Sequence, residues 1–196
     1  MASLSVAGKS RLKRELSMLQ TDPPPGVTAY LESDDDQDLT MWRAEIVGPQ
    51  DSPFAEGTFE LTIRMPARYP FEPPSCRFVG DVMPFHPNID SSGRICLDTL
   101  KSQPSGSWSP AVSLPSLLLS LRSLLAEPNP DDGLVMEISN MYRNSPEQWK
   151  SEAQKRTREG MASKTTRAAN SKKRTGSSDG HETATKKSKS TVTKGL

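Results

Sequence analysis

Cysteine is scarce in this chain, which has only Cys76 and Cys96 among its 196 residues. Two cysteines do not resemble the disulfide framework of a small secreted domain, and no apolar signal sequence opens the chain. The longest apolar run, Leu114–Ala126, is too short and too interrupted by Ser and Arg to span a bilayer. We therefore expect a soluble intracellular protein without a membrane segment, whose thiols stay reduced.

Apolar residues are also few. They make up 33% of the chain, and the mean hydropathy is −0.62. The polar excess lies mainly beyond residue 158, where nine Lys/Arg stand against three Asp/Glu, a balance of +6. The whole chain carries +1, so the first 158 residues carry −5. We expect a flexible N-terminus over residues 1–8, an acidic globular domain over 9–158 and a disordered basic tail over 159–196.

Histidine is limited to His86 and to His181 in the tail. Cys96 lies in a loop-like segment ten residues after His86, which first suggests a thiol nucleophile. The spacing is not that of a hydrolytic Cys–His pair, and such signatures do not transfer between families. Cys76, by contrast, alternates with Phe78 along an expected strand, which favours a buried core position.

Periodic apolar residues predict a helix followed by a sheet. Leu12, Leu16 and Leu19 recur at helical spacing, which predicts a helix within 9–20. Alternating apolar residues, bounded by turns rich in Pro, Gly and Asp, predict four strands. Their expected ranges are 27–31, 39–47, 58–65 and 75–79. Because the connections are short, we expect an antiparallel meander.

The stretch 80–110 is irregular and rich in Pro, Gly and Ser, and so long a loop in a compact domain is usually functional. The segment 114–126 is apolar on nearly every side and predicts a buried helix. Two more helices are expected over 132–143 and 146–158. The order of one helix, four antiparallel strands, a long loop and three helices predicts an α+β domain.

Five short motifs carry the functional signal. They are Arg68-Tyr-Pro-Phe-Glu-Pro-Pro74, His86-Pro-Asn88, Cys96-Leu-Asp98, Trp108-Ser-Pro110 and Glu127-Pro-Asn-Pro-Asp-Asp132. Together they closely resemble the ubiquitin-conjugating enzyme family, and the likeness extends from about Arg11 to about Arg158. The resemblance implies the UBC-like fold and an acyltransferase with no metal or nucleotide cofactor. Such an enzyme accepts the C-terminal glycine of ubiquitin from a ubiquitin-activating enzyme as a thioester. With a RING-type ligase, it then transfers ubiquitin to a lysine of a protein substrate.

The resemblance also implies roles for individual residues. Cys96 is the thioester nucleophile, a role that suits a thiol because its thiolate both attacks and leaves. Asn88 holds the active-site loop and stabilises the tetrahedral oxyanion. Asp132 orients the incoming lysine and eases its deprotonation, and Asp98 helps to shape the acidic mouth around the thiol. For His86 we expect a structural hydrogen bond to the neighbouring backbone.

Plainer roles compete with these assignments. An Asn beside Pro often satisfies the backbone of a turn, and Asp98 also suits a solvated loop charge. Asp131 and Asp132 also suit the N-cap of the helix that follows them. We assign Asp131 to the cap and Asp132 to both roles.

The resemblance further implies one docking surface shared by the activating enzyme and the ligase. It combines basic residues of the first helix with two loops. An exposed Phe beside Pro is the kind of anchor that interfaces use, whereas the helix charges alone equally suit a solvated face. The surface comprises Arg11, Lys13 and Arg14, then Arg68 and Phe71, and finally Trp108, Ser109, Pro110 and Ala111.

Within the family, the chain most closely resembles the T-type branch, which acts in the Fanconi anaemia DNA-repair pathway. The resembling features are the segment Ile89–Asp98, the lengthened loop Lys101–Trp108 and the basic tail. Ser109 departs from this branch, which carries a basic residue there. The likeness implies a role in DNA repair and a Fanconi-type ligase as partner.

The tail has basic clusters at 172–174 and 186–189, with eleven residues between them. This spacing resembles a bipartite nuclear-import signal, so we expect an import receptor as a partner and a nuclear as well as cytoplasmic location. The alternatives are a solvating charged tail or weak binding to phosphates.

Three other functions compete with ubiquitin conjugation. The chain could be an inactive ubiquitin-binding variant, but such modules lack the cysteine that is intact here. It could conjugate a different ubiquitin-like modifier, which the sequence does not separate securely. A nucleic-acid-binding role through the tail is secondary, because the globular domain is acidic.

Overall fold

The computed structural model describes residues 4–33, 35 and 38–175. One helix is followed by four strands and then by further helices, which confirms the predicted α+β fold. The elements are α1 (Val6–Thr21), β1 (Val27–Leu31), β2 (Met41–Val47), β3 (Thr58–Arg64), β4 (Ser75–Val79), the 3-10 turn η1 (Asp98–Leu100), α2 (Leu114–Ala126), the 3-10 turn η2 (Pro130–Asp132), α3 (Met136–Asn144) and α4 (Pro146–Thr175).

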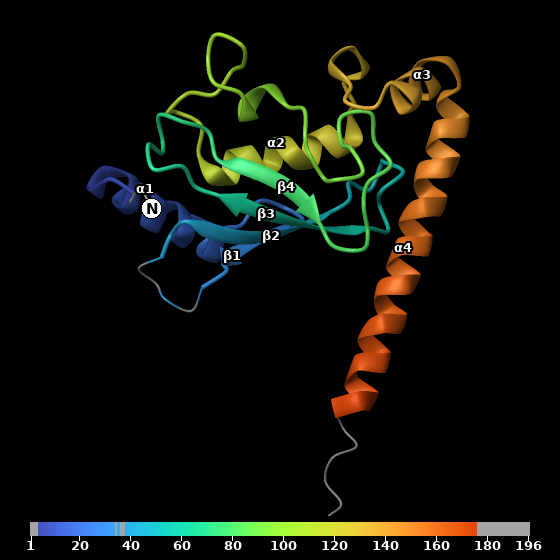
Figure 1. Cartoon of the computed structure of the whole chain (residues 1–196), viewed down its shortest axis with the longest axis horizontal. Coiled ribbons are helices and arrows are strands. Elements are labelled where there is room, and N and C mark those ends of the chain that lie inside the picture. The colour runs from blue at the N-terminus through green and yellow to red at the C-terminus, as the bar shows by residue number, and fades with distance from the viewer. Residues whose placement is uncertain (1–3, 34, 36–37, 176–196) are drawn as a thin grey trace, which may run out of the picture.

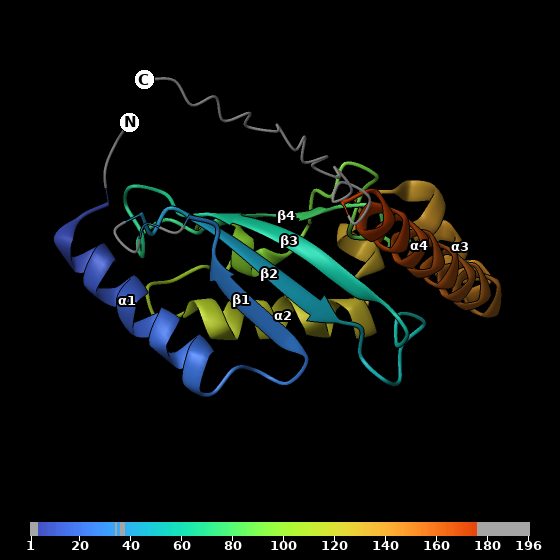
Figure 2. The same cartoon turned by 90° about the horizontal axis from the view of Figure 1, so that it is seen from below.

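The four strands form one antiparallel sheet in the order β1-β2-β3-β4, as predicted. Its register places Trp42 opposite Ile63 and Ala44 opposite Leu61, all of them buried. The intervening side chains point to the opposite, wetter face, because successive residues of a strand alternate. The helix α2 lies across the buried face (Figures 1 and 2).

The helix α2 begins at a capping box in which the Ser113 and Ser116 side chains bond to each other's backbone N–H groups. Its leucines, apart from the exposed Leu119, fill the core beneath the sheet. The helix α1 packs beside β1 and α2 and buries Leu12 and Leu19. One apolar layer between helices and sheet therefore supports the whole domain.

Ordered structure begins at Leu4, nearer the N-terminus than predicted. The Ser5 hydroxyl accepts a hydrogen bond from the Gly8 N–H at 3.0 Å and caps α1. Leu4 packs into the core with 5% of its surface exposed. The predicted flexible segment 1–8 is therefore wrong for residues 4–8, and residues 1–3 lie outside the described part.

The helix predicted over 132–143 begins four residues later. The N–H groups of Leu134 and Val135 both donate to the carbonyl of Pro87, at 2.9 and 3.1 Å, which holds this segment extended before α3. Asp131 does not cap α3, because its carboxylate pairs with Arg143 at 2.5 Å. This extended segment binds the end of η2 to the active-site loop.

The last helix, α4, ends at Thr175 instead of near Arg158, and it projects from the domain in Figure 1. Gly160 lies close against Val82, and Met161 packs on the core. Lys164 pairs with Glu60 at 2.5 Å, and Arg167 pairs with Asp81. The predicted disordered tail is therefore wrong for residues 159–175. The second basic cluster, 186–189, lies outside the described residues.

None of the helices in the described ranges is long and apolar enough to cross a membrane.

Removing residues 159–175 should therefore destabilise the domain. A chain ending at Arg158 loses two surface ion pairs, which add little. It also loses the Met161 packing, for which we expect about 2 kcal/mol. In a domain of this size, that corresponds to a melting temperature lower by about 6 °C. Calorimetry against a chain ending at Thr175 measures the difference. Equal melting temperatures would contradict this account of α4.

Candidate active site

The loop after β4 is shaped by a tight turn at 90–93. The Asp90 carboxylate accepts hydrogen bonds from the N–H groups of Ser92 and Arg94, at 2.9 and 3.0 Å. Gly93 has a φ of 80°, and a Cβ there would lie 1.9 Å from the Phe78 carbonyl oxygen, so only glycine fits. The turn sends the chain back along the segment it has just left.

This return brings Cys96 beside Asn88. Ile89 and Ile95 form an antiparallel bridge, and the Cys96 N–H donates to the Asn88 carbonyl at 2.9 Å. The Cys96 thiol is partly buried. The backbone, and not the side chains, therefore fixes the distance between these two predicted site residues.

The Asn88 side chain ties the loop to η2. Its Nδ2 donates to the carbonyls of Asn129 and Asp132 at 2.7 and 3.0 Å, and its Oδ1 accepts from the Asn129 N–H at 2.9 Å. The residue is fully buried. Because both amide hydrogens are donated, this geometry supports the loop-holding role, whereas an oxyanion role requires one of these bonds to open.

His86 fixes the backbone of Asn88 from below. Its Nε2–H donates to the Leu124 carbonyl at 2.8 Å, and its Nδ1 accepts from the Asn88 N–H at 3.0 Å. Burial lowers the pKa of His86 to about 4, so the ring is neutral at physiological pH. Both ring nitrogens are occupied by backbone groups, and neither faces the thiol chemistry.

The thiol of Cys96 meets Asp132 across the site. The Sγ donates to Asp132 Oδ2 at 3.0 Å. Burial and this carboxylate raise the pKa of Cys96, while Lys101 opposes them. The protein therefore holds a neutral thiol that donates a hydrogen bond to a carboxylate. The two groups predicted to act on ubiquitin and on lysine lie in direct contact.

Lys101 is a member of the site that sequence reasoning missed. Its Nζ lies 2.5 Å from Asp132 Oδ2 and 3.4 Å from Asp98 Oδ1. The hydrogen bond to Asp132 raises the pKa of Lys101, and hydrogen bonds from Cys96 and Lys101 lower the pKa of Asp132. The Asp98–Lys101 spacing of three residues was a visible signal, but the contact with Asp132 was not. Asp98 is thus an ion-pair partner of Lys101.

The predicted docking residues divide into two groups. Lys13, Arg14 and Arg68 are exposed, as are Pro110 and Ala111, and Phe71 is 68% exposed. Ser109 is half-buried.

Trp108 and Arg11 support the surface from beneath. Trp108 is buried, and its Nε1 donates to the Pro70 carbonyl at 2.9 Å. Arg11 is partly buried, and its guanidinium donates to the carbonyls of Pro110 and Val112. Trp108 therefore holds two loops together and does not present its ring to a partner.

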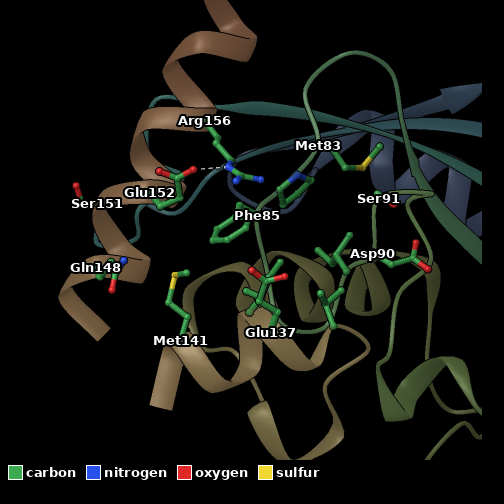
Figure 3. A pocket seen from close by; sticks show the side chains of 14 residues that line it. Met83, Phe85, Asp90, Ser91, Glu137, Met141, Gln148, Ser151, Glu152 and Arg156 are labelled. Carbon is green, nitrogen blue, oxygen red and sulfur yellow. Dashed lines mark hydrogen bonds and ion pairs between the residues drawn. The ribbon is translucent and has the colours of Figure 1, made fainter. Parts of the chain in front are cut away.

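A separate pocket of about 630 Å³ lies behind the active-site loop, between that loop, α3 and α4 (Figure 3). Its apolar lining includes Met83, Phe85 and Met141, and the Arg156 guanidinium lies 4.1 Å from the centre of the Phe85 ring. Neither Cys96 nor Asp132 lines it. The pocket is thus separate from the chemistry of the thiol.

No group of three or more His, Cys, Asp and Glu side chains that could hold a metal occurs within residues 4–33, 35 and 38–175.

Comparison with known proteins identifies the family of the chain. The family model described as "Ubiquitin-conjugating enzyme" matches residues 11–157. Ubiquitin-conjugating enzyme E2 T of Bos taurus is 48% identical over 161 residues, which cover 78% of this chain and 80% of the relative. The Homo sapiens protein of the same name is 49% identical over 138 residues, which cover 70% and 68%. The chain is thus a transferase that belongs to the ubiquitin-conjugating enzyme family, whose members work with ubiquitin, an activating enzyme and a ligase.

Proposed function

We propose that Cys96 carries ubiquitin as a thioester and passes it to a substrate lysine. In charging, the Cys96 sulfur attacks the carbonyl carbon of ubiquitin's C-terminal glycine on the activating enzyme. The thiol of that enzyme leaves and takes up the proton that Cys96 loses. The observation that carries this proposal is the 3.0 Å contact of the Cys96 thiol with Asp132.

Discharge, the transfer of ubiquitin to lysine, uses the Asp132 carboxylate of the same contact. Once Cys96 is acylated, its thiol proton is gone, and Asp132 Oδ2 has room to accept a hydrogen bond from an incoming lysine. The neutral amine attacks the thioester carbonyl, a C–N bond forms and the C–S bond breaks. The sulfur leaves as a thiolate, and the amine proton passes to Asp132 or to solvent. The Lys101 ammonium, which lies 2.5 Å from Asp132 Oδ2, supports the fit of a lysine side chain at this carboxylate.

The raised pKa of Cys96 supports the lifetime of the thioester. A thiolate with a higher pKa is a poorer leaving group. A poorer leaving group slows attack by water and by lysine alike, so the amine that Asp132 holds in position gains the rate advantage over water. This favours transfer over hydrolysis.

An inactive ubiquitin-binding variant fits the site less well. Such a module needs neither a partly exposed thiol nor a buried asparagine that holds a carboxylate beside it. Conjugation of another ubiquitin-like modifier uses the same chemistry and is separated by experiment alone.

We further propose that the substrate belongs to DNA repair and that a Fanconi-type ligase is the partner. The support is the sequence resemblance to the T-type branch, while Ser109 lies where that branch has a basic residue. We also propose nuclear import through the clusters at 172–174 and 186–189, with an import receptor as partner. The support for import is the spacing of the two clusters.

Asp132→Ala should separate the two half-reactions. Charging should stay within about threefold of wild type, because the substitution removes an acceptor that raises the pKa of the thiol. Discharge to free lysine at pH 7 should fall about 100-fold. Raising the pH toward 10 should narrow that gap, since a free lysine with a pKa near 10.4 is then already neutral. Single-turnover discharge measured from pH 7 to pH 10 gives both quantities.

Asp131→Ala is the matched control, because it removes the neighbouring carboxylate, which pairs with Arg143 instead of the thiol. We expect normal charging and discharge. Equal losses in both half-reactions of Asp132→Ala, or a gap that is the same at every pH, would contradict the role proposed for Asp132.

A further inference from the structure

A buried carboxylate lies beneath the predicted docking surface. Glu15 of α1 has only 3% of its surface exposed. Its Oε2 accepts a hydrogen bond from the Tyr69 hydroxyl at 2.6 Å, and its Oε1 accepts from Arg11 Nε at 2.9 Å. A buried charge is costly unless it is paired and hydrogen-bonded, and here both oxygens are.

Arg11 extends this network to the second loop of the docking surface, which contains Trp108, Ser109, Pro110 and Ala111. Its Nη1 donates to the Pro110 carbonyl at 2.5 Å and its Nη2 to the Val112 carbonyl at 2.8 Å. Its guanidinium also lies 5.7 Å from the centre of the Tyr69 ring. Three nitrogens of one planar group are thus used at once, which fixes the loop at 110–112 relative to α1.

Tyr69 extends the network to the first loop of the docking surface, which contains Arg68 and Phe71. It is completely buried between the exposed residues Arg68 and Phe71. Its ring lies 6.0 Å from the Trp108 ring, and Trp108 in turn donates to the Pro70 carbonyl. Burial and the Glu15 carboxylate raise the pKa of the Tyr69 hydroxyl, so it remains a donor at physiological pH.

The network therefore touches all three segments of the predicted docking surface. Its side-chain hydrogen bonds stay within these segments, and the Trp108 backbone N–H donates to the carbonyl of Lys101 at 3.1 Å. Ion pairs at i and i+4 on a helix surface contribute little. The Arg11–Glu15 pair differs because its acid is buried and because its partners belong to two loops distant in sequence.

From this geometry we propose that Glu15 and Tyr69 are positioning residues for partner binding. Acting through Arg11, they hold the first docking loop, the second docking loop and α1 in the arrangement that the activating enzyme and the ligase contact. The inference rests on the proposed function, because it concerns the surface through which Cys96 is charged and discharged.

The test is a KM-against-kcat comparison for Tyr69→Phe and Glu15→Gln. Tyr69→Phe removes the hydroxyl donor, whereas Glu15→Gln removes the negative charge and one of the two acceptor oxygens. Both nearly keep the volume of the side chain. With ubiquitin and ATP in excess, we expect the KM for the protein as substrate of the activating enzyme to rise about tenfold in both, with kcat changed less than twofold. Stimulation of discharge by a RING-type ligase should fall by a similar factor.

Two further variants sharpen the comparison. Glu152→Gln makes the same chemical change in the i, i+4 pair with Arg156 on α4 and should leave the KM unchanged. Arg11→Lys keeps the charge but cannot make three hydrogen bonds from one plane. It should therefore raise the KM as Glu15→Gln does. A normal KM for Arg11→Lys would mean that a point charge suffices and would overturn the positioning role.

Hydrogen exchange tests the same inference without any enzyme activity. In Tyr69→Phe, the amides of Trp108 and Val112, which donate to Lys101 and Ser109 in the second loop, should exchange about tenfold faster, while the β2–β3 amides stay protected. Unchanged exchange in the loop would overturn the inference, as would faster exchange throughout the domain with a loss of kcat. If the wild-type protein is not charged at all, the proposed function fails, whereas the exchange result still decides whether the network holds the loops.

Discussion

Cys96→Ser should abolish the reductant-sensitive ubiquitin adduct. A serine hydroxyl is far less acidic than a thiol, so attack on the activating enzyme's thioester should slow by a factor on the order of 10⁴ or more. Any adduct that does form is an oxyester and should survive reductant. Non-reducing and reducing gels, run side by side after charging, distinguish the two bonds.

Cys76→Ser is the control for this substitution. Cys76 lies opposite Ile63 on the inward side of β4, where burial raises the pKa of its thiol to about 12. The variant should charge normally and lose about 1–3 kcal/mol of stability, because it buries a hydroxyl. A folded Cys76→Ser that fails to charge, together with a Cys96→Ser that still forms a thioester, would show that the nucleophile is misassigned.

Asn88→Ala should have the second largest effect, and it should appear after charging. The substitution leaves the backbone bond from Cys96 to Asn88 in place, so charging should stay within about threefold of wild type. It removes three partly buried hydrogen bonds to Asn129 and Asp132, and each partner left unpaired costs about 1–3 kcal/mol. With Asp132 no longer held, and with the Asn88 amide no longer available as an oxyanion donor, discharge to lysine should fall about 10²- to 10³-fold. Pre-charged enzyme mixed with free lysine reports that rate.

Hydrogen exchange separates the two roles of Asn88. If Asn88 acts by holding the loop, the backbone amides of η2 should lose protection from exchange in Asn88→Ala. Pro130→Gly, which loosens η2 but keeps Asn88, should then also slow discharge. If discharge collapses while η2 stays protected and Pro130→Gly is normal, the loop-holding role is wrong and oxyanion stabilisation remains.

The sheet and α2 could be predicted from the sequence because local chemistry determines them. Apolar alternation fixed the inward faces of β2 and β3, and Pro- and Gly-rich turns bounded the strands. The boundaries of α3 and α4 were missed because distant residues set them. The Pro87 carbonyl delays α3, and contacts with Val82, Glu60 and Asp81 extend α4.

The site was predicted in part for the same reason. The resemblance supplied Cys96, Asn88 and Asp132, and the structure brings all three together. Lys101 meets Asp132 across 31 residues of sequence, and Tyr69 meets Glu15 across 54, so no local pattern announced either contact. Such pairs depend on how the loops close over the sheet, which composition and periodicity do not encode.

Intact mass spectrometry after charging with a panel of modifiers tests the central claim most directly. The protein is incubated with ATP, each modifier and its activating enzyme, and is weighed before and after reductant. We predict that the mass increases by that of one ubiquitin minus one water, and that this happens with ubiquitin but with no other modifier of the panel. Reductant should remove the added mass, and Cys96→Ser should prevent it. An adduct formed only with another modifier, or none with any modifier, would contradict the assignment of Cys96 as a ubiquitin carrier.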